Sequence, residues 1–297
     1  MRILVTGGSG QLGQCIKEVV RTQNVGDLYD FIFLGREELD IGNRENISEI
    51  LDRYSPTFVV NCAAFVDTVG AEEKVQLAYL TNAIGPLNLA EKCNEIGAKL
   101  IHISTDMVFD GNQNTPYYEF QTCVPINVYG ASKYVGEELI KRTMDNYVII
   151  RTSWLYSEYG NNFVTKVMKL LKNDGEYEFT CDQVSCPTYA MNLARFIVHL
   201  IVDEKNCYGV YHFTDMGIAS RYDFAHEISI LTKSGDPTQY NDFKIVPCDT
   251  LADDKIRRQK YTVLSTEKAR KSFPNFRFEN WRVALKRCID KIQKKQG

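Results

Sequence analysis

The sequence contains no uninterrupted hydrophobic run that approaches the roughly 18 residues needed to span a bilayer. Its longest apolar stretch, from Phe58 to Val66, is interrupted by Asn61. The N-terminus enters a strand-like segment at once, without the basic region, apolar region and small-residue cleavage site of a signal peptide. These absences predict that the chain has no transmembrane segment and is cytoplasmic.

The sequence also lacks the spacings that hold metals or disulfide frameworks. Its nine cysteines are scattered without a C-x-x-C pair, and its four histidines show no metal-ligand spacing, so neither a disulfide framework nor a zinc site is expected. An excess of basic residues is missing as well, because 35 lysines and arginines stand against 38 aspartates and glutamates. Since nucleic-acid-binding proteins usually present a basic face, no nucleic-acid partner is expected.

What is present is the composition of an ordinary globular protein, with 44% hydrophobic and 25% charged residues in 297 positions. Short apolar strands alternate with helical patterns through the first half. Strands are predicted over 3–6, 31–34, 57–62, 99–103 and 147–151, and helices over 11–22, 43–54, 72–96 (kinked at Pro86) and 129–144. This alternation indicates a parallel sheet that is covered by helices on both faces.

The alternation of strands and helices becomes less regular after residue 152. Helices are predicted over 161–172, 191–203, 221–232 and 280–294, a strand over 208–213, and loops or short strands over 177–188 and 234–261. We therefore predict an α/β protein with a Rossmann-type, doubly wound parallel sheet. Residues 1–155 would form this dinucleotide-binding domain, with a segment at about 190–215 returning to it. Residues 156–297 would mainly form a smaller, mixed α/β substrate-binding domain.

The first strand leads directly into a glycine-rich loop. Gly7, Gly10 and Gly13 follow the spacing G-x-x-G-x-x-G between a strand and a helix. The first glycine permits a tight turn, the second permits backbone to approach a pyrophosphate, and the third permits close packing of helix and sheet. The free N–H groups at the helix N-terminus would then face the phosphates. This context favours a dinucleotide site over a simple turn.

The second strand ends at Leu34-Gly35-Arg36, without the acidic residue that NAD-specific sites use to bind the ribose 2′-hydroxyl. Arg36 could pair with a 2′-phosphate, which favours NADPH over NADH; the other interpretation is a solvated surface arginine. Asp40 and Ile41 follow at a place where an acidic and an apolar side chain could hold the adenine.

Tyr129 and Lys133 form a Y-x-x-x-K pair in a predicted helix, so their side chains would lie one turn apart on the same face. A neighbouring ammonium favours the phenolate and should lower the pKa of the tyrosine from its usual value near 10. The tyrosine could then exchange a proton with a carbonyl or an alcohol. The lysine could also hold the nicotinamide ribose, and the Thr105 hydroxyl could orient the same substrate oxygen.

Together these residues resemble the extended short-chain dehydrogenase/reductases and, within them, the dTDP-4-dehydrorhamnose reductases. The resemblance covers nearly the whole chain. Its most specific part is STDMVFDG from Ser104 followed by RTSWLY from Arg151. It is also carried by LVTGGSGQLG from Leu4, ELDI from Glu38, VVNCAAF from Val59, NAIGP from Asn82, YGASK from Tyr129, GNNF from Gly160, DQVSCPT from Asp182 and KYTVL from Lys260.

The resemblance implies an oxidoreductase that uses NADPH or NADH to reduce the 4-keto group of a nucleotide-linked 6-deoxyhexose. The expected reaction converts dTDP-4-dehydro-L-rhamnose to dTDP-L-rhamnose, for cell-surface polysaccharide, in a monomer or homodimer without a membrane partner. Tyr129 would be the catalytic acid, Lys133 its partner, and Thr105 the residue that polarises the carbonyl. Gly7, Gly10, Gln11, Leu12, Gly13, Arg36, Asp40, Ile41, Ala63, Ala64, Tyr129 and Lys133 would bind the cofactor, and Ser104, Thr105, Met107 and Trp154 the substrate.

Several positions depart from the family pattern, all on the expected substrate side. Met107 replaces a tyrosine, Phe65-Val66 replaces a segment that begins with a small polar residue, Ser185 replaces a glycine, and Gln259 stands in an R-P-x-x-S motif. These changes predict a different sugar specificity or a reduced activity. Some relatives bind magnesium through a glutamate soon after the glycine loop; because Cys15 stands there, no metal is expected.

Other activities are known on the same fold. A 4,6-dehydratase needs an Asp–Glu pair after the threonine, and an epimerase–reductase needs a titratable group at about position 107, but the chain has Asp106-Met107. A sugar-nucleotide 4-epimerase or another 4-keto-sugar reductase stays open, because both need only the hydride site and Tyr129. A non-catalytic, NADP-binding regulatory subunit, as in eukaryotic methionine adenosyltransferase, is a further alternative. The intact Thr105, Tyr129 and Lys133 favour an enzyme.

Overall fold

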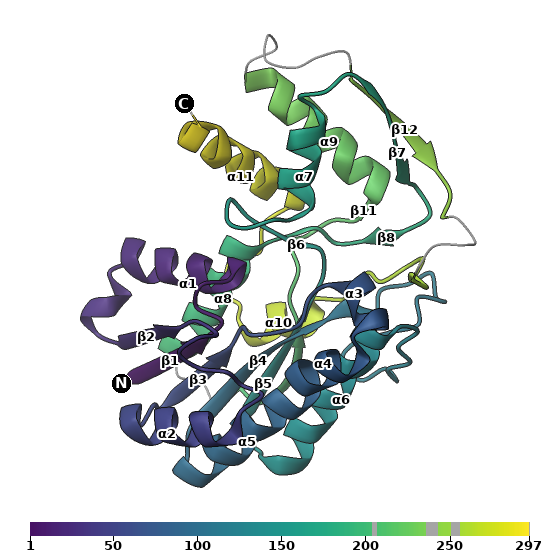
Figure 1. Ribbon diagram of the computed structural model, residues 1–297. Helices are drawn as coiled ribbons and strands as arrows, with labels where there is room; N and C mark the ends of the chain where they lie inside the picture. The colour runs from purple at the N-terminus through teal and green to yellow at the C-terminus, as the bar shows by residue number, and fades with distance from the viewer. Residues whose placement is uncertain (204–206, 236–242, 251–255, 297) are drawn as a thin grey trace.

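The structure is a computed structural model that describes residues 1–203, 207–235, 243–250 and 256–296. A six-stranded sheet lies at the centre of its lower part, and all neighbouring strands in it are parallel (Figure 1). The strand order is β10-β5-β4-β3-β1-β2. The strands are β1 (Arg2–Thr6), β2 (Asp30–Leu34), β3 (Phe58–Asn61), β4 (Lys99–Thr105), β5 (Tyr147–Thr152) and β10 (Gly209–His212).

Alternation along the strands creates two hydrophobic layers, because successive side chains point to opposite faces of a sheet. Ile3 and Val5 pack on one face with α1 (Gln11–Thr22) and α8 (Ala190–Val202). Leu4 packs on the other face, which is covered by α2 (Arg44–Tyr54), α5 (Gly85–Ile96) and α6 (Val128–Thr143). The predicted doubly wound α/β fold is thereby confirmed.

The predicted single helix over 72–96 is wrong. The segment consists of α3 (Thr68–Glu73), α4 (Val75–Tyr79), a π-helical turn (Leu80–Ile84) and α5. The irregular turn ends at Ile84, two residues before Pro86. Proline has no N–H to donate, and its ring would clash with the carbonyl four residues earlier in a regular helix. The distortion therefore lies before the proline.

The upper part of the molecule is built from the later segments (Figure 1). It contains β6 (Leu155–Tyr156), α7 (Phe163–Leu170), β7 (Gly175–Thr180), β8 (Val184–Ser185), β9 (Thr188–Tyr189), β11 (Ala219–Ser220), α9 (Arg221–Gly235), β12 (Phe243–Cys248) and α11 (Trp281–Gln296). The short helix α10 (Glu267–Ser272), which packs against β10, was not predicted. Of the predicted loop 234–261, residues 236–242 and 251–255 lie outside the described residues.

The returning segment joins the central sheet: β10 pairs with β5, and α8 packs on α1. The division into a cofactor domain and a substrate domain stays a prediction.

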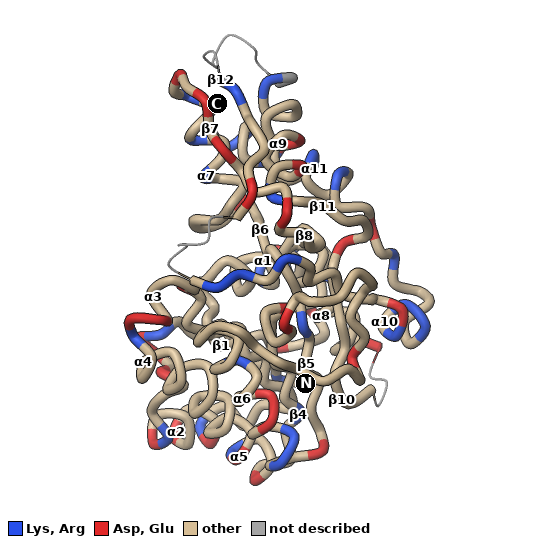
Figure 2. The backbone as a smooth tube through the Cα atoms, turned by 90° about the vertical axis from the view of Figure 1, so that its right-hand side faces the viewer, with Lys and Arg blue, Asp and Glu red and all other residues tan. Residues whose placement is uncertain are grey.

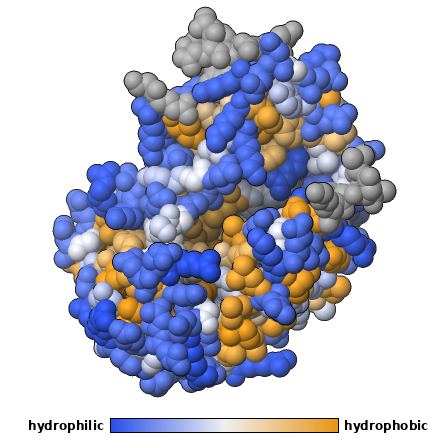
Figure 3. Space-filling model, viewed as in Figure 1, coloured by the Kyte–Doolittle hydropathy of each residue, from blue (hydrophilic) through white to orange (hydrophobic). Residues whose placement is uncertain are grey.

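Lysines and arginines are mixed with aspartates and glutamates over both parts (Figure 2), and most of the face in Figure 3 is hydrophilic. No helix in the described ranges is both long and apolar enough to cross a bilayer.

Candidate active site

The glycine loop lies where β1 is flanked by β2 on one side and β3 on the other. In such sheets, ligands bind at the carboxyl ends of the strands, where the strand order changes direction. Gly7 has a φ of +61°, and a Cβ there would lie 2.9 Å from the Ala63 nitrogen. A Cβ on Gly13 would lie 2.5 Å from the Gly7 carbonyl oxygen. Gly10 caps α1 without a side chain, so the loop leaves the helix N-terminus open to an anion.

Arg36 and Asp40 are exposed, whereas Leu12 and Ile41 are buried in the core. Arg36 is beside the glycine loop, because a Cβ on the preceding Gly35 would lie 3.4 Å from the Ser9 hydroxyl oxygen. Any contact of Leu12 or Ile41 with a cofactor would therefore come mainly from their backbone. The predicted adenine contacts of Asp40 and Ile41 stay predictions.

Gln11 connects the glycine loop to the segment after β5. Its amide nitrogen donates to the Leu155 carbonyl at 3.3 Å, and its carbonyl oxygen accepts from Asn162 at 2.9 Å. The Ala63 amide donates to the Asn61 side-chain oxygen at 3.2 Å, which fixes the end of β3 against Gly7. Ala64 follows and is partly exposed. These contacts place Gln11, Ala63 and Ala64 around one end of the sheet.

Thr105 ends β4, and Tyr129 and Lys133 lie one turn apart in α6. Gly130 permits this arrangement, because a Cβ there would lie 2.1 Å from the Met107 carbonyl oxygen. The helix can therefore begin directly against the turn that follows β4. A hydrogen bond links Tyr129 with Thr105, so the three predicted catalytic residues are brought together.

The expected lowering of the Tyr129 pKa is wrong for this structure. Burial raises the pKa of Tyr129 to about 12, although its hydrogen bond with Thr105 acts in the opposite direction. The Lys133 amine does not offset this effect, because it donates to the Ile103 carbonyl at 2.6 Å and lies 3.3 Å from His102 Nε2. Tyr129 thus stays protonated at neutral pH, as a proton donor must.

Ser104 lies on the opposite side of β4 from Thr105, since adjacent strand residues point to opposite faces. Its hydroxyl donates to Glu137 at 2.5 Å, and Glu137 accepts from the Arg151 guanidinium at 2.6 Å. All three side chains are buried. This placement argues against the predicted substrate contact of Ser104, because its hydroxyl already belongs to a buried ion-pair cluster.

Met107 lies in a 3₁₀ turn over Asp106–Val108, and it is partly exposed. Because β4 ends at Thr105, the alternation of side chains along a strand does not apply to Met107. Two departures from the family pattern hold this turn. The Gln259 amide donates to the Met107 carbonyl at 3.1 Å, and the Ser185 hydroxyl donates to Asp106 at 3.1 Å.

Trp154 has a φ of +43°, an uncommon left-handed conformation for a bulky residue. Such outliers cluster at functional sites. Its ring is stacked on Phe224, and the Arg221 guanidinium carbon lies 3.7 Å from its ring centroid. Burial and the nearby Arg258 lower the pKa of Arg221 to about 10, while Asp106 acts against this shift.

Sequence reasoning missed Arg221, because nothing in its local sequence distinguishes it from a surface arginine. Sequence reasoning also missed a buried polar chain of Thr6, Asn61 and His102 that leads to Lys133. A signal for this chain was available, since Asn61 and His102 each interrupt an apolar strand. Buried polar groups in such positions need partners.

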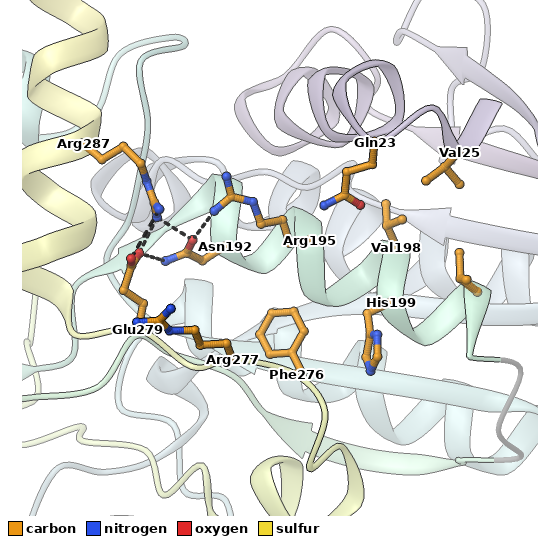
Figure 4. Close-up of a pocket in the computed structure, with 11 residues that line it drawn as sticks. Gln23, Val25, Asn192, Arg195, Val198, His199, Phe276, Arg277, Glu279 and Arg287 are labelled. Atoms are coloured by element: carbon orange, nitrogen blue, oxygen red, sulfur yellow. Dashed lines mark hydrogen bonds and ion pairs between the residues drawn. The ribbon is translucent and has the colours of Figure 1, made fainter. Parts of the chain in front are cut away.

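A separate cavity of about 480 Å³ lies at the other end of α1, beside Gln23. Arg195 and Arg287 line it and both donate to Asn192 at 3.0 Å (Figure 4). None of the predicted site residues lines this cavity, so it belongs to neither the predicted cofactor site nor the predicted substrate site.

A doubly wound parallel sheet, a glycine loop after its first strand and a Tyr–Lys helix beside Thr105 define the class of short-chain dehydrogenase/reductases. Residues 1–294 match the family model described as the RmlD substrate binding domain, and the chain belongs to this family. The resemblance seen in the sequence is confirmed.

Known relatives match over nearly the full length. The dTDP-4-dehydrorhamnose reductase of Aggregatibacter actinomycetemcomitans is 34% identical over 291 residues, covering 96% of this chain and 97% of that protein. A solved dTDP-4-dehydrorhamnose reductase from Clostridium acetobutylicum is 39% identical, covers 99% of this chain and 100% of its own, and has a TM-score of 0.90. The Bacillus anthracis enzyme, solved in complex with NADP, is 34% identical, covers 98% of this chain and 99% of its own, and has a TM-score of 0.88.

Proposed function

We propose that this chain is a reductase that converts dTDP-4-dehydro-L-rhamnose to dTDP-L-rhamnose with NADPH as the reductant. The observation that carries the proposal is the placement of Tyr129 beside Thr105, with Lys133 one turn away, at the same end of the sheet as the glycine loop. The names of the full-length relatives support the choice of substrate, and the NADP-bound relative supports the choice of cofactor.

The residues present fit a dinucleotide. Close backbone approach at Gly7 and Gly13 leaves no room for side chains, and the open N-terminus of α1 suits a pyrophosphate. The bound cofactor would supply the hydride. Thr105 would then donate a hydrogen bond to the substrate carbonyl oxygen, and Tyr129 would transfer its phenolic proton to that oxygen as the hydroxyl forms. If Trp154 packs against the diphosphate arm of the substrate, the Arg221 guanidinium on its ring would supply a positive charge beside that arm.

The direct test is NADPH oxidation against a panel of 4-keto-sugar nucleotides. We expect the fastest turnover with dTDP-4-dehydro-L-rhamnose. No oxidation with any member of the panel would exclude the reductase and favour the non-catalytic subunit. Tight retention of the cofactor on purification, together with sugar interconversion, would favour a 4-epimerase. We further propose a cytoplasmic monomer or homodimer that needs no metal, because Cys15 stands where some relatives have a metal-binding glutamate.

Replacing Arg36 with alanine should weaken NADPH binding by roughly 10-fold or more and leave NADH binding nearly unchanged. The reason is the loss of a charge-assisted hydrogen bond to the 2′-phosphate. Dissociation constants for both cofactors, measured by fluorescence titration, check this result. Arg142→Ala, at the exposed end of α6, is the matched control. Equal weakening for both cofactors, or none, would make Arg36 a surface charge only.

Met107 suggests a second candidate function for this chain, the reduction of a different or less hydroxylated 4-keto sugar. The methionine offers an apolar, flexible chain where relatives offer an aromatic hydroxyl. Met107→Tyr should therefore shift the kcat/KM ratio toward dTDP-4-dehydro-L-rhamnose by roughly fivefold, the value of one hydrogen bond. Competition assays with two sugars measure the ratio, and Met216→Tyr, at an exposed position, is the control. If the ranking of substrates does not change, Met107 is a neutral packing difference.

A further inference from the structure

We propose that the cavity between the C-terminal end of α1, α8 and α11 binds a phosphate group that is carried by a small molecule with an apolar or aromatic part. Arg195, Arg277 and Arg287, which line this cavity, bind the phosphate. The cavity is separate from the glycine loop and from Tyr129. The inference therefore goes beyond the proposed function and does not depend on it.

The cavity has the size and the lining of a small-molecule site. Its volume of about 480 Å³ lies within the range of roughly 300–1,000 Å³ that is usual for such sites. Val25, Val198 and Phe276 contribute apolar walls, whereas Gln23 and the arginines contribute polar groups (Figure 4). A few polar groups in apolar surroundings are what a pocket needs to hold a ligand in one orientation.

The cavity carries more positive than negative charge. Three arginines line it, but among its described lining residues the single carboxylate is Glu279. Glu279 is already paired with Arg287, whose two terminal nitrogens donate to its two carboxylate oxygens. Arg195 and Arg277 form no ion pair within the described part of the chain. Two guanidinium charges are thus left for a ligand.

Arg195 and Arg287 converge on the amide oxygen of Asn192. Arg195 Nη1 from α8 and Arg287 Nη2 from α11 each donate to Asn192 Oδ1 at 3.0 Å (Figure 4). The two nitrogens can therefore be no further apart than twice that distance. Like charges so close repel each other, and burial together with Arg287 lowers the pKa of Arg195. A bound anion relieves this repulsion.

The orientation of the Asn192 amide follows from its charged neighbours. Its nitrogen donates to Asp215 at 2.8 Å and to Glu279 at 3.2 Å, while its oxygen accepts from the two guanidinium groups. Turning the amide round would place its oxygen against the carboxyl groups and its NH₂ group against the guanidinium groups. Because Asn192 is only 6% exposed, water cannot replace these partners. The convergence of the two arginines is therefore built into the fold.

Asp215 does not compensate the two unpaired arginines. It accepts from the Asn192 amide and from the Tyr189 N–H at 2.8 Å each. Burial and, to a smaller extent, Glu279 raise its pKa to about 7, so the carboxyl group is partly protonated at neutral pH. Asp215 is 1% exposed and does not line the cavity. The cavity itself therefore keeps its excess of positive charge.

A phosphate group fits this arrangement better than a carboxylate. A phosphate monoester carries about −1.5 to −2 charge at neutral pH and three strong acceptor oxygens. A carboxylate carries a single charge and offers two oxygens. Guanidinium groups bind phosphate through paired N–H donors, so one phosphate can satisfy both Arg195 and Arg277. The apolar walls leave room for an uncharged ring or chain.

The test is isothermal titration calorimetry of the full-length chain with phenyl phosphate, with NADP⁺ at saturation so that the cofactor site is filled. Phenyl phosphate should bind at one site and more tightly than inorganic phosphate, because its ring buries apolar surface. Benzoate, which carries a carboxylate on the same ring, should bind more weakly than phenyl phosphate. Equal binding of benzoate and phenyl phosphate, or no binding of phenyl phosphate, would overturn the inference.

Arg195→Gln should weaken the binding of phenyl phosphate by roughly 10-fold or more, the effect of losing charge-assisted hydrogen bonds. Glutamine can still donate to Asn192, so the local structure should persist. Arg142→Gln, at the exposed end of α6, is the matched control and should leave the affinity unchanged. If Arg195→Gln does not fold, Arg277→Gln, at an exposed position, decides in the same way.

The variants also locate the bound phosphate. An affinity that is unchanged in Arg195→Gln would exclude this cavity as the site. A loss of affinity in Arg221→Gln but not in Arg195→Gln would place the phosphate beside Trp154 and would equally overturn the inference. Since no step of the test measures sugar reduction, its outcome is independent of the proposed function.

Discussion

Replacing Tyr129 with phenylalanine should lower kcat for sugar-nucleotide reduction by about 10²–10⁴-fold, the usual contribution of a general acid. The phenyl ring fills the same space against Thr105 but has no proton to donate to the carbonyl oxygen. The affinity for NADPH should change little. Steady-state NADPH oxidation and a separate fluorescence titration of the cofactor measure the two effects.

Tyr134→Phe provides the matched control, because Tyr134 lies in the same helix and packs beside Phe109 and Tyr117 instead of Thr105. This control variant should keep nearly full activity. If Tyr129→Phe also keeps most of its activity, Tyr129 is not the acid of the reaction.

Replacing Arg151 with methionine should lower the free energy of unfolding by about 3–5 kcal/mol, the usual cost of leaving a buried charge without its partner. Arg151 pairs with Glu137 at 2.6 Å, and the two side chains are 2% and 0% exposed. Urea denaturation at neutral pH measures the loss. Arg53→Met breaks an exposed pair with Glu49 and should leave stability nearly unchanged.

The loss of stability in Arg151→Met should become smaller as the pH falls. Arg151 holds the pKa of Glu137 below its ordinary value, despite burial. The stability contributed by this depressed pKa is present above the ordinary carboxyl pKa and is lost as pH falls through the folded-state pKa. In Arg151→Met, the buried Glu137 would take up a proton readily, so the deficit should shrink between pH 7 and pH 4. A deficit that is independent of pH would assign the loss to packing.

The regular elements were predictable because their periodicity is local. The helix over Gln11–Thr22 has the bounds that the sequence predicts, since glycines define its start and its apolar face is continuous. The break at Lys74 and the π-helical turn before Pro86 were not predictable, because the apolar pattern continues through both. Their form depends on how these turns pack against α6.

In the candidate site, too, local spacing predicts some features but misses those that depend on residues far apart in the chain. Helical spacing predicts that Tyr129 and Lys133 share a face, and the structure has them one turn apart in α6. The turn that places Met107 is held from far along the chain by Gln259 and Ser185, which no local pattern reveals. The raised pKa of Tyr129 likewise follows from burial and from the direction of Lys133, neither of which can be read from spacing.

The position of β10 constrains how this protein can be synthesised. The apolar face of α1 has no cover until α8 has left the ribosome. The edge of β5 stays open until Gly209–His212 has followed. Open strand edges and uncovered apolar faces promote association between nascent chains. The first five strands therefore cannot complete their layer as they emerge. The six-stranded sheet can therefore be completed only after residue 212 of the 297 has been translated.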